Sequence, residues 1–132
     1  ELGRTLGEEL LTPTCIYVRD IMHLLNSEVK AKGMCNITGG GYIENIPRMI
    51  PDGLCARVKM RTYDNPIYDM LAHEGDIDEE EMYATFNMGT GFVIAVDARD
   101  FDTACDMLRP FGHAPFELGV VAEGKEKIDL CL

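Results

Sequence analysis

Three consecutive glycines, Gly39, Gly40 and Gly41, directly follow Thr38 and are the residues of this sequence best suited to bind a charged ligand. Glycine adopts positive φ angles without strain, so such a run allows a sharp turn or a close approach of the backbone to a ligand. Successive backbone N–H groups in a turn can form a concave site for phosphate or carboxylate. A tight structural turn also explains the glycines, so the neighbouring residues must decide between the two interpretations.

Polar and cationic side chains close behind the glycines favour an anion site. Asn45 supplies an amide and Arg48 a guanidinium, which suits bidentate contacts with anions. Pro47 and Pro51 restrict the backbone where the chain leaves the loop. We therefore predict that the glycine N–H groups, the Thr38 hydroxyl and these two side chains hold an anionic group of a ligand.

A second glycine pair, Gly89 and Gly91, follows Asn87 and precedes the apolar run 92–96. An uninterrupted apolar run indicates a central strand covered on both faces, and glycines beside it indicate a bulge or a close backbone approach. The spacing is not that of a dinucleotide-binding loop, because the third glycine is missing. Packing and ligand binding explain these glycines equally well, and in the second case they form another wall of the same pocket.

These motifs together resemble a known family. The sequence resembles the carboxy-terminal half of the phosphoribosylformylglycinamidine cyclo-ligases, the aminoimidazole ribonucleotide (AIR) synthetases of purine biosynthesis. The motifs keep the order and spacing of that family at positions 10–14, 16–18, 37–41, 44–48 with Pro51, 81–83 and 85–91. The resemblance implies the α+β fold of an AIR synthase C-terminal domain.

The resemblance also implies an activity for the parent protein. Members of the family convert formylglycinamidine ribonucleotide to aminoimidazole ribonucleotide with ATP and Mg²⁺, which are held mainly by the amino-terminal half. The expected partners are the phosphorylated ribonucleotide, the missing amino-terminal domain and, in the full-length protein, a second copy in a homodimer. We expect this chain alone to bind neither ATP nor Mg²⁺, and to fold without catalysing the reaction.

The resemblance and the motifs define one set of candidate substrate-binding residues. They are Asn36, Thr38, Gly39, Gly40, Gly41, Asn45, Arg48, Asn87, Gly89 and Gly91. The family usually has a small residue and a histidine where this chain has Cys35 and Asn36. Histidine titrates near neutral pH whereas asparagine only forms hydrogen bonds, so Asn36 favours a positioning role over proton transfer. No catalytic residue and no metal site is assigned.

Two alternative functions remain open. Related carboxy-terminal domains occur in selenophosphate synthetase, thiamine-phosphate kinase and formylglycinamidine synthetase, and this chain would then be a phosphate-ligand binding domain of one of those types. The joint presence of residues 44–48 and 86–89 favours the cyclo-ligases. The second alternative is a non-catalytic oligomerisation domain in which the glycines only form turns.

Composition and charge set further limits. The 132 residues, of which 46% are hydrophobic, are typical of one soluble domain with a single core. A formal net charge of −11 argues against sequence-independent binding to nucleic acid or to an anionic membrane. Neither a membrane-spanning run nor a signal peptide is recognisable. Five scattered cysteines indicate reduced thiols in a cytoplasmic protein.

The first third of the chain is expected to contain one helix and one strand. Residues 1–12 indicate a connector from a missing amino-terminal domain, and residues 13–132 indicate the domain itself. Thr12 and Pro13 predict a helix start. This helix is expected to end near Gly33 and to face the core with Val18, Ile21, Met22, Leu25 and Val29. A strand over 34–38 then places the three glycines at a strand end.

The remaining elements follow from periodicity and capping. Alternation over 54–61 predicts a half-buried strand, and Asn65 with Pro66 begins a helix that ends at Gly75. The acidic residues of 76–81 are expected in the first turn of the next helix, where the dipole favours negative charge. Asp100 is predicted to cap a helix that carries Phe101, Ala104, Cys105 and Leu108 on one stripe.

Two final alternating segments, 116–120 and 128–132, flank a turn at 123–125 and indicate a hairpin. Helices and strands are thus interleaved, with adjacent strands at the end of the chain. This order predicts an α+β domain with a mixed, largely antiparallel sheet and packed helices.

Overall fold

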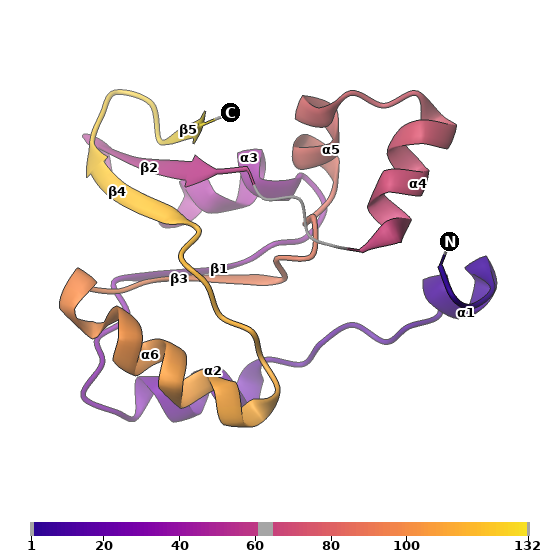
Figure 1. Ribbon diagram of the computed structural model, residues 1–132. Helices are drawn as coiled ribbons and strands as arrows, with labels where there is room; N and C mark the ends of the chain where they lie inside the picture. Colours follow the sequence, from indigo (N-terminus) through magenta and orange to yellow (C-terminus); the bar gives the residue numbers. More distant parts are fainter. Residues whose placement is uncertain (1, 61–64, 132) are drawn as a thin grey trace.

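The computed structural model describes residues 2–60 and 65–131 (Figure 1). Its helices are α1 (Leu6–Leu10), α2 (Val18–Leu25), α3 (Gly41–Asn45), α4 (Pro66–Gly75), α5 (Glu79–Thr85) and α6 (Phe101–Leu108). Its strands are β1 (Gly33–Asn36), β2 (Leu54–Lys59), β3 (Phe92–Ala95), β4 (Gly119–Glu123) and β5 (Ile128–Cys131). Short 3-10 turns span Ile46–Met49, Ala98–Asp100 and Arg109–Phe111.

The strands form two sheets, one antiparallel and one mixed. β1 pairs antiparallel with β3, while β2 lies at the centre of a second sheet in the order β4-β2-β5. β4 runs antiparallel to β2, and β5 runs parallel to it. These sheets and their helices confirm the predicted α+β class.

The predicted hairpin between the last two strands is wrong. β4 and β5 do not pair with each other but flank β2 on opposite edges. The turn between them passes over the start of β2, where the Gly124 N–H donates to the Gly53 carbonyl and Gly124 packs against Cys55. This crossing places β5 on the far edge of β2, and alternation along a strand carries no information on which edge a partner takes.

The central strand β2 follows the predicted alternation except at Cys55, which is buried beside Gly124 although it alternates with the apolar residues. Ala56 and Val58 are buried, and Arg57 and Lys59 between them are exposed. The predicted strand also included residue 61, and the predicted last strand included residue 132. Both positions lie outside the described residues, as does residue 1 of the predicted connector.

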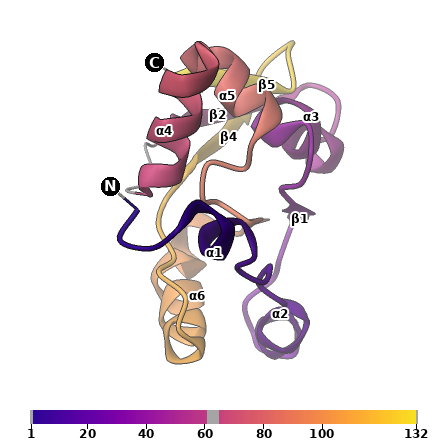
Figure 2. The ribbon, with the colours of Figure 1, turned by 90° about the vertical axis from the view of Figure 1, so that its right-hand side faces the viewer.

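The structure has two apolar clusters. The elements that carry them, the three-stranded sheet with α3 and α5 for one and α2 with α6 for the other, lie on opposite sides of the β1–β3 pair (Figures 1 and 2). The larger cluster contains Tyr42, Val58 and Tyr83 and joins the three-stranded sheet to α3 and α5. The smaller one contains Leu24 and Ala104 and joins α2 to α6. The strand pair β1–β3 therefore lies between two packed layers.

β3 differs in part from its predicted role as a central strand. Val93 packs against the larger cluster and Ile94 against the smaller one, so apolar residues do cover both faces. Within the described part of the chain, however, β3 pairs with β1 alone, and each of its four residues stays half-buried. The run of apolar residues reflects packing on two faces and not a central position.

The predicted start of α2 at Thr12 and Pro13 is wrong. Residues 12–17 are not helical, and α2 begins at Val18 with Tyr17 as its N-cap. The Thr12 hydroxyl donates to the Glu8 carbonyl and caps no helix. The aromatic ring of Tyr17 packs against β3 instead, and this tertiary contact holds the preceding segment out of the helix.

The predicted core stripe of this helix is wrong at three of its five residues, and the helix ends at Leu25 and not near Gly33. Leu24 is fully buried, but the side chains of Val18 and Met22 are 70% and 49% exposed, and Leu25 is exposed as well. Val29 is buried but lies beyond the end of the helix. The helix therefore rests on α6 through a different face and leaves an apolar one uncovered.

The segment predicted as a connector contains the short helix α1. The Thr5 hydroxyl accepts from the Glu8 N–H at 3.3 Å, and the Glu8 carboxylate accepts from the Thr5 N–H at 2.9 Å. This reciprocal pair is a capping box. The Thr5-x-x-Glu8 spacing was a readable signal for it.

The three later helices lie where capping and periodicity place them. α4 begins at Pro66 after Asn65, whose side chain accepts from the Ile67 N–H, and it ends at Gly75. Asp78 caps α5, whose first turn carries the acidic residues. α6 follows Asp100 as predicted and buries Ala104 and Cys105, but its N-cap makes no side-chain hydrogen bond because a 3-10 turn leads directly into the helix.

Candidate ligand-binding site

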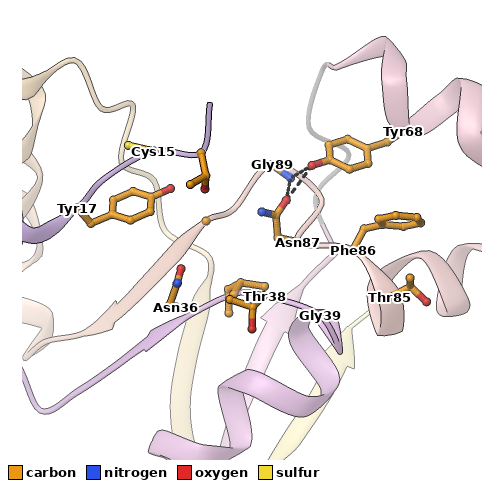
Figure 3. Close-up of a pocket in the computed structure, with 13 residues that line it drawn as sticks. Cys15, Tyr17, Asn36, Thr38, Gly39, Tyr68, Thr85, Phe86, Asn87 and Gly89 are labelled. Carbon is orange, nitrogen blue, oxygen red and sulfur yellow. Dashed lines mark hydrogen bonds between the residues drawn. The ribbon is translucent and has the colours of Figure 1, made fainter. Parts of the chain in front are cut away.

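Three motif-bearing segments surround one pocket of about 510 Å³ (Figure 3). They are the extended chain before α2, the end of β1 with the first part of the glycine loop, and the segment between α5 and β3. α4 contributes one further side chain. The lining residues are Thr14, Cys15, Tyr17, Asn36, Ile37, Thr38, Gly39, Tyr68, Thr85, Phe86, Asn87, Gly89 and Gly91.

Asn45 holds the glycine loop in its shape. Its side-chain amide is buried and donates to the carbonyls of Gly41 at 2.8 Å, Gly39 at 3.3 Å and Thr38 at 3.4 Å. Its amide oxygen accepts from the Thr38 hydroxyl at 3.4 Å and from Arg48 Nη1 at 3.2 Å. Asn45 thus supports the pocket from behind and does not line it.

Gly40 and Gly41 have packing reasons to be glycine. Both have positive φ angles, +89° and +52°, which side chains rarely tolerate. A Cβ on Gly41 would overlap the Tyr83 carbonyl, and one on Gly40 would overlap the Glu44 carboxylate. The Gly41 N–H donates to the Thr38 carbonyl at 3.1 Å. These two glycines therefore face residues of α3 and α5 behind the loop, whereas Gly39 faces the pocket.

Arg48 lies outside the pocket lining. Its guanidinium is mostly exposed and pairs with the Glu44 carboxylate at 3.7 Å. An exposed pair of this kind contributes little to stability, so the side chain can reorient at small cost. In this conformation Arg48 contacts the back of the loop through Asn45.

The opposite wall contains a closed hydrogen-bond triangle (Figure 3). The Tyr68 hydroxyl donates to Asn87 Oδ1 at 2.8 Å, and the Gly89 N–H donates to Asn87 Oδ1 at 3.0 Å and to Tyr68 Oη at 3.2 Å. The triangle uses the Asn87 oxygen and leaves its amide nitrogen directed elsewhere. It fixes the loop between α5 and β3 against α4.

Tyr17 closes the other end of the pocket. A Cβ on Gly91 would overlap Tyr17 Oη, so this glycine provides the space that the hydroxyl occupies. The ring stacks on His113 with 5.8 Å between ring centroids, and His113 Nε2 lies 2.7 Å from the buried Asp20 Oδ2. Hydrogen bonds from Arg19 and His113 hold the pKa of Asp20 below its usual range.

The side chains that line the pocket are neutral. The named lining contains hydroxyl, amide, thiol and apolar groups but neither carboxylates nor lysine or arginine. Burial raises the pKa of the Tyr17 hydroxyl, with Cys15 adding to the shift, so it stays protonated at neutral pH. Burial also raises the pKa of Cys35, which lies beside the pocket, to about 11. That thiol is therefore not a nucleophile at neutral pH.

The structure brings together six of the ten candidate residues. Asn36, Thr38, Gly39, Asn87, Gly89 and Gly91 line the pocket. Gly40, Gly41, Asn45 and Arg48 lie behind the loop and shape it. Tyr17 and Tyr68 were not candidates, although Tyr17 lies within one of the motifs at 16–18. No signal in the sequence pointed to Tyr68.

Within 2–60 and 65–131, no group of three or more histidine, cysteine, aspartate or glutamate side chains is placed to hold a metal ion. None of the helices described is both long and apolar enough to cross a membrane.

Comparison with known proteins identifies the family. A family described as "AIR synthase related protein, C-terminal domain" matches residues 1–130. The chain is 47% identical over 131 residues to a phosphoribosylformylglycinamidine cyclo-ligase of Lachnospira eligens, which covers 98% of the chain and 38% of the relative. It is 45% identical over 126 residues to the cyclo-ligase of Caldanaerobacter subterraneus, which covers 95% of the chain and 37% of the relative.

The chain spans about two fifths of the length of the curated relatives it matches. Within that span, the match runs through all the segments that surround the pocket. The chain therefore belongs to the AIR synthase related proteins and is their carboxy-terminal domain.

Proposed function

We propose that this chain is the carboxy-terminal, substrate-binding part of a phosphoribosylformylglycinamidine cyclo-ligase, and that its pocket holds the ribonucleotide substrate. The observation that carries the proposal is the convergence of three motif segments, distant in the sequence, on one pocket of about 510 Å³. A pocket of that size is within the range of small-molecule sites.

The lining residues suit a ligand rich in hydrogen-bonding groups. Thr38 donates its hydroxyl proton to Asn45 and keeps lone pairs that can accept from a sugar hydroxyl. The Asn36 amide and the Asn87 amide nitrogen offer further donors. A phosphate on the pocket side of the glycine loop, where Gly39 lies, would be held by backbone N–H groups other than that of Gly41, which donates to Thr38. Arg48 would be able to join after it leaves Glu44.

ATP and Mg²⁺ belong, in this proposal, to the part of the protein outside this chain. The described residues provide no set of carboxylates that fits a magnesium site. The role proposed for this chain is to bind and orient the substrate, which lowers the barrier by positioning.

The proposed partners are the amino-terminal domain and, in the full-length protein, a second copy in a cytoplasmic homodimer. The relatives are much longer than this chain, and α2 carries an uncovered apolar face. Contiguous exposed apolar surface is typical of an interface. The relatives named above are cyclo-ligases. No observation favours the selenophosphate, thiamine-phosphate or formylglycinamidine synthetase types, or an oligomerisation role without a ligand.

An NMR titration of the 132-residue chain tests the proposal. Formylglycinamidine ribonucleotide should cause saturable shifts centred on Asn36, Thr38, Gly39 and Asn87, and ribose 5-phosphate should shift the glycine loop. Thr38→Val should weaken binding of both ligands by about tenfold, the value of one hydrogen bond.

Thr103→Val is the matched control, because Thr103 is exposed on α6 and lies outside the pocket lining. It should leave both affinities unchanged. Absence of shifts up to millimolar ligand would contradict the proposal. The chain alone should also show no cyclo-ligase turnover, and turnover by it would refute the assignment of ATP chemistry to the missing part.

A further inference from the structure

Tyr17 occupies a position in the pocket that the glycine motifs do not explain. Its ring is tilted against Phe92 with 5.3 Å between ring centroids, and it stacks on His113 on another side. Gly91 leaves room for its hydroxyl oxygen. Contacts on several sides hold the hydroxyl in one place, as recognition of a specific ligand group requires.

The support beneath the ring is itself fixed. His113 Nε2 lies 2.7 Å from Asp20 Oδ2, and Asp20 Oδ1 accepts from Arg19 Nε at 2.8 Å. Asp20 is buried on α2, whereas His113 comes from the segment after α6. Tyr17 therefore rests on a hydrogen-bonded group that joins its own helix α2 to the distant segment after α6.

The Tyr17 end of the pocket offers neutral hydrogen-bonding groups. Figure 3 shows Tyr17 and Asn36 on one side of the pocket, across from Tyr68, Asn87 and Gly89. A protonated tyrosine hydroxyl and a side-chain amide can each donate and accept. Such groups match an amide or amidine, whereas a phosphate is held better by N–H groups and cations.

The same residues separate two different environments. Tyr17 and Asn36, together with Cys15, line both the polar pocket and a neighbouring apolar groove of about 470 Å³. The rest of the groove is formed by Ile16, by Val18, Ile21 and Met22 of α2, and by Phe92. The Tyr17 hydroxyl at this boundary can therefore bind the end of a ligand whose hydrogen-bonding groups lie in the polar pocket.

We propose that Tyr17 is a specificity-determining residue of this site. Its hydroxyl, together with the Asn36 amide, hydrogen-bonds the amide- and amidine-bearing part of the ribonucleotide and not its ribose phosphate. The inference rests on the proposed function and adds to it a direction for the bound substrate.

The test compares two ligands on two tyrosine variants of the 132-residue chain. Tyr17→Phe keeps the ring and its packing but removes the hydroxyl. It should weaken binding of formylglycinamidine ribonucleotide by about tenfold and leave binding of ribose 5-phosphate unchanged. Tyr83→Phe is the control, because Tyr83 is buried in the larger core cluster and does not line the pocket. It should change neither affinity.

Each outcome decides the inference. Equal weakening of both ligands by Tyr17→Phe, or weakening of neither, overturns the specificity role. If Thr38→Val weakens binding while Tyr17→Phe does not, the inference fails and the proposed function stands. If the unmodified chain binds neither ligand, both are rejected. An unchanged free energy of unfolding of Tyr17→Phe in urea would show that the aromatic packing is intact.

Discussion

Gly91 shows how one missing side chain shapes the pocket. The Tyr17 hydroxyl lies in the space that a Cβ on this residue would fill. The Gly91 carbonyl also accepts from the Ile37 N–H at 3.0 Å, so its backbone cannot easily move away. Glycine is required at this position because the Tyr17 hydroxyl lies so close to its Cα, and not because the backbone needs conformational freedom.

Gly91→Ala should therefore expel the Tyr17 ring from its contacts with Phe92 and His113. We expect the free energy of unfolding to fall by about 2 kcal/mol, as is typical for an overpacked site, and ligand binding to weaken. Urea unfolding and NMR titration would measure both. The double variant Gly91→Ala with Tyr17→Phe removes part of the clash and should recover part of the lost stability. Additive losses would contradict the proposed overlap.

Asp20 is the other residue that supports Tyr17, through His113. Its pKa is lowered in the folded state by the hydrogen bonds from Arg19 and His113. A depressed carboxyl pKa contributes stability that is present above the unfolded pKa and is lost as the pH falls through the folded pKa.

Asp20→Asn should therefore lower the free energy of unfolding at neutral pH and make it depend less on pH in the acidic range. Urea unfolding from neutral pH to about pH 3, below the usual aspartate pKa, would compare the two proteins. The difference between the two proteins should narrow as the pH falls toward the lowered folded pKa of Asp20. A constant difference across this range would show that the charge of Asp20 does not contribute.

At the scale of elements, side chains of α3 hold the glycine loop in its conformation. α3 is only five residues long, so its stability comes from packing and from the Asn45 amide that joins three loop carbonyls. Tyr42 on the same helix is fully buried and donates to the Thr90 hydroxyl at 2.6 Å. The loop and the segment before β3 are thus fastened to one short helix.

Asn45→Ala should destabilise the protein by about 2 kcal/mol, because the buried Gly41 carbonyl and the part-buried bonds to Thr38 and Gly39 lose their donor. It should also accelerate amide hydrogen exchange over residues 38–41 before global unfolding. Asn26→Ala is the matched control, since Asn26 is exposed after α2, and should cost less than about 0.5 kcal/mol. Equal costs for the two variants would mean that Asn45 does not organise the loop.

At the scale of the whole molecule, apolar residues are unevenly exposed. Many of the large exposed ones lie on α1, on α2 and between them, including Leu11, Ile16 and Val18. In contrast, Leu24 on the same helix α2 is fully buried against α6. A single amphipathic helix therefore packs one side into this domain and leaves apolar residues on the other side in solvent.

The double substitution Val18→Gln and Met22→Gln should change the free energy of unfolding by less than about 0.5 kcal/mol per site, because these side chains bury little. It should also reduce self-association in sedimentation experiments. Leu24→Ala, on the same helix, should cost about 3 kcal/mol through the cavity it leaves. A large loss of stability in the glutamine variant would show that the face is covered within this domain.

The sequence by itself determined the elements that depend on neighbouring residues, such as capped helix starts and alternating strands. Asn65 with Pro66 and Asp78 with the acidic residues after it fix two helix starts, because capping and the helix dipole act within one turn. Alternation in β2 fixes its buried face, because side chains alternate along any strand. The motifs likewise placed six of the ten candidate residues on the pocket.

Only the tertiary structure decided the features that depend on distant contacts. β5 lies beside β2 and not beside β4 because the turn at Gly124 passes over Gly53. α2 begins at Val18 and exposes its apolar stripe because Tyr17 is held against Phe92 and His113, and Leu24 meets α6. Hydrophobic periodicity shows that a face is apolar, but what covers that face depends on residues far away in the chain or outside it.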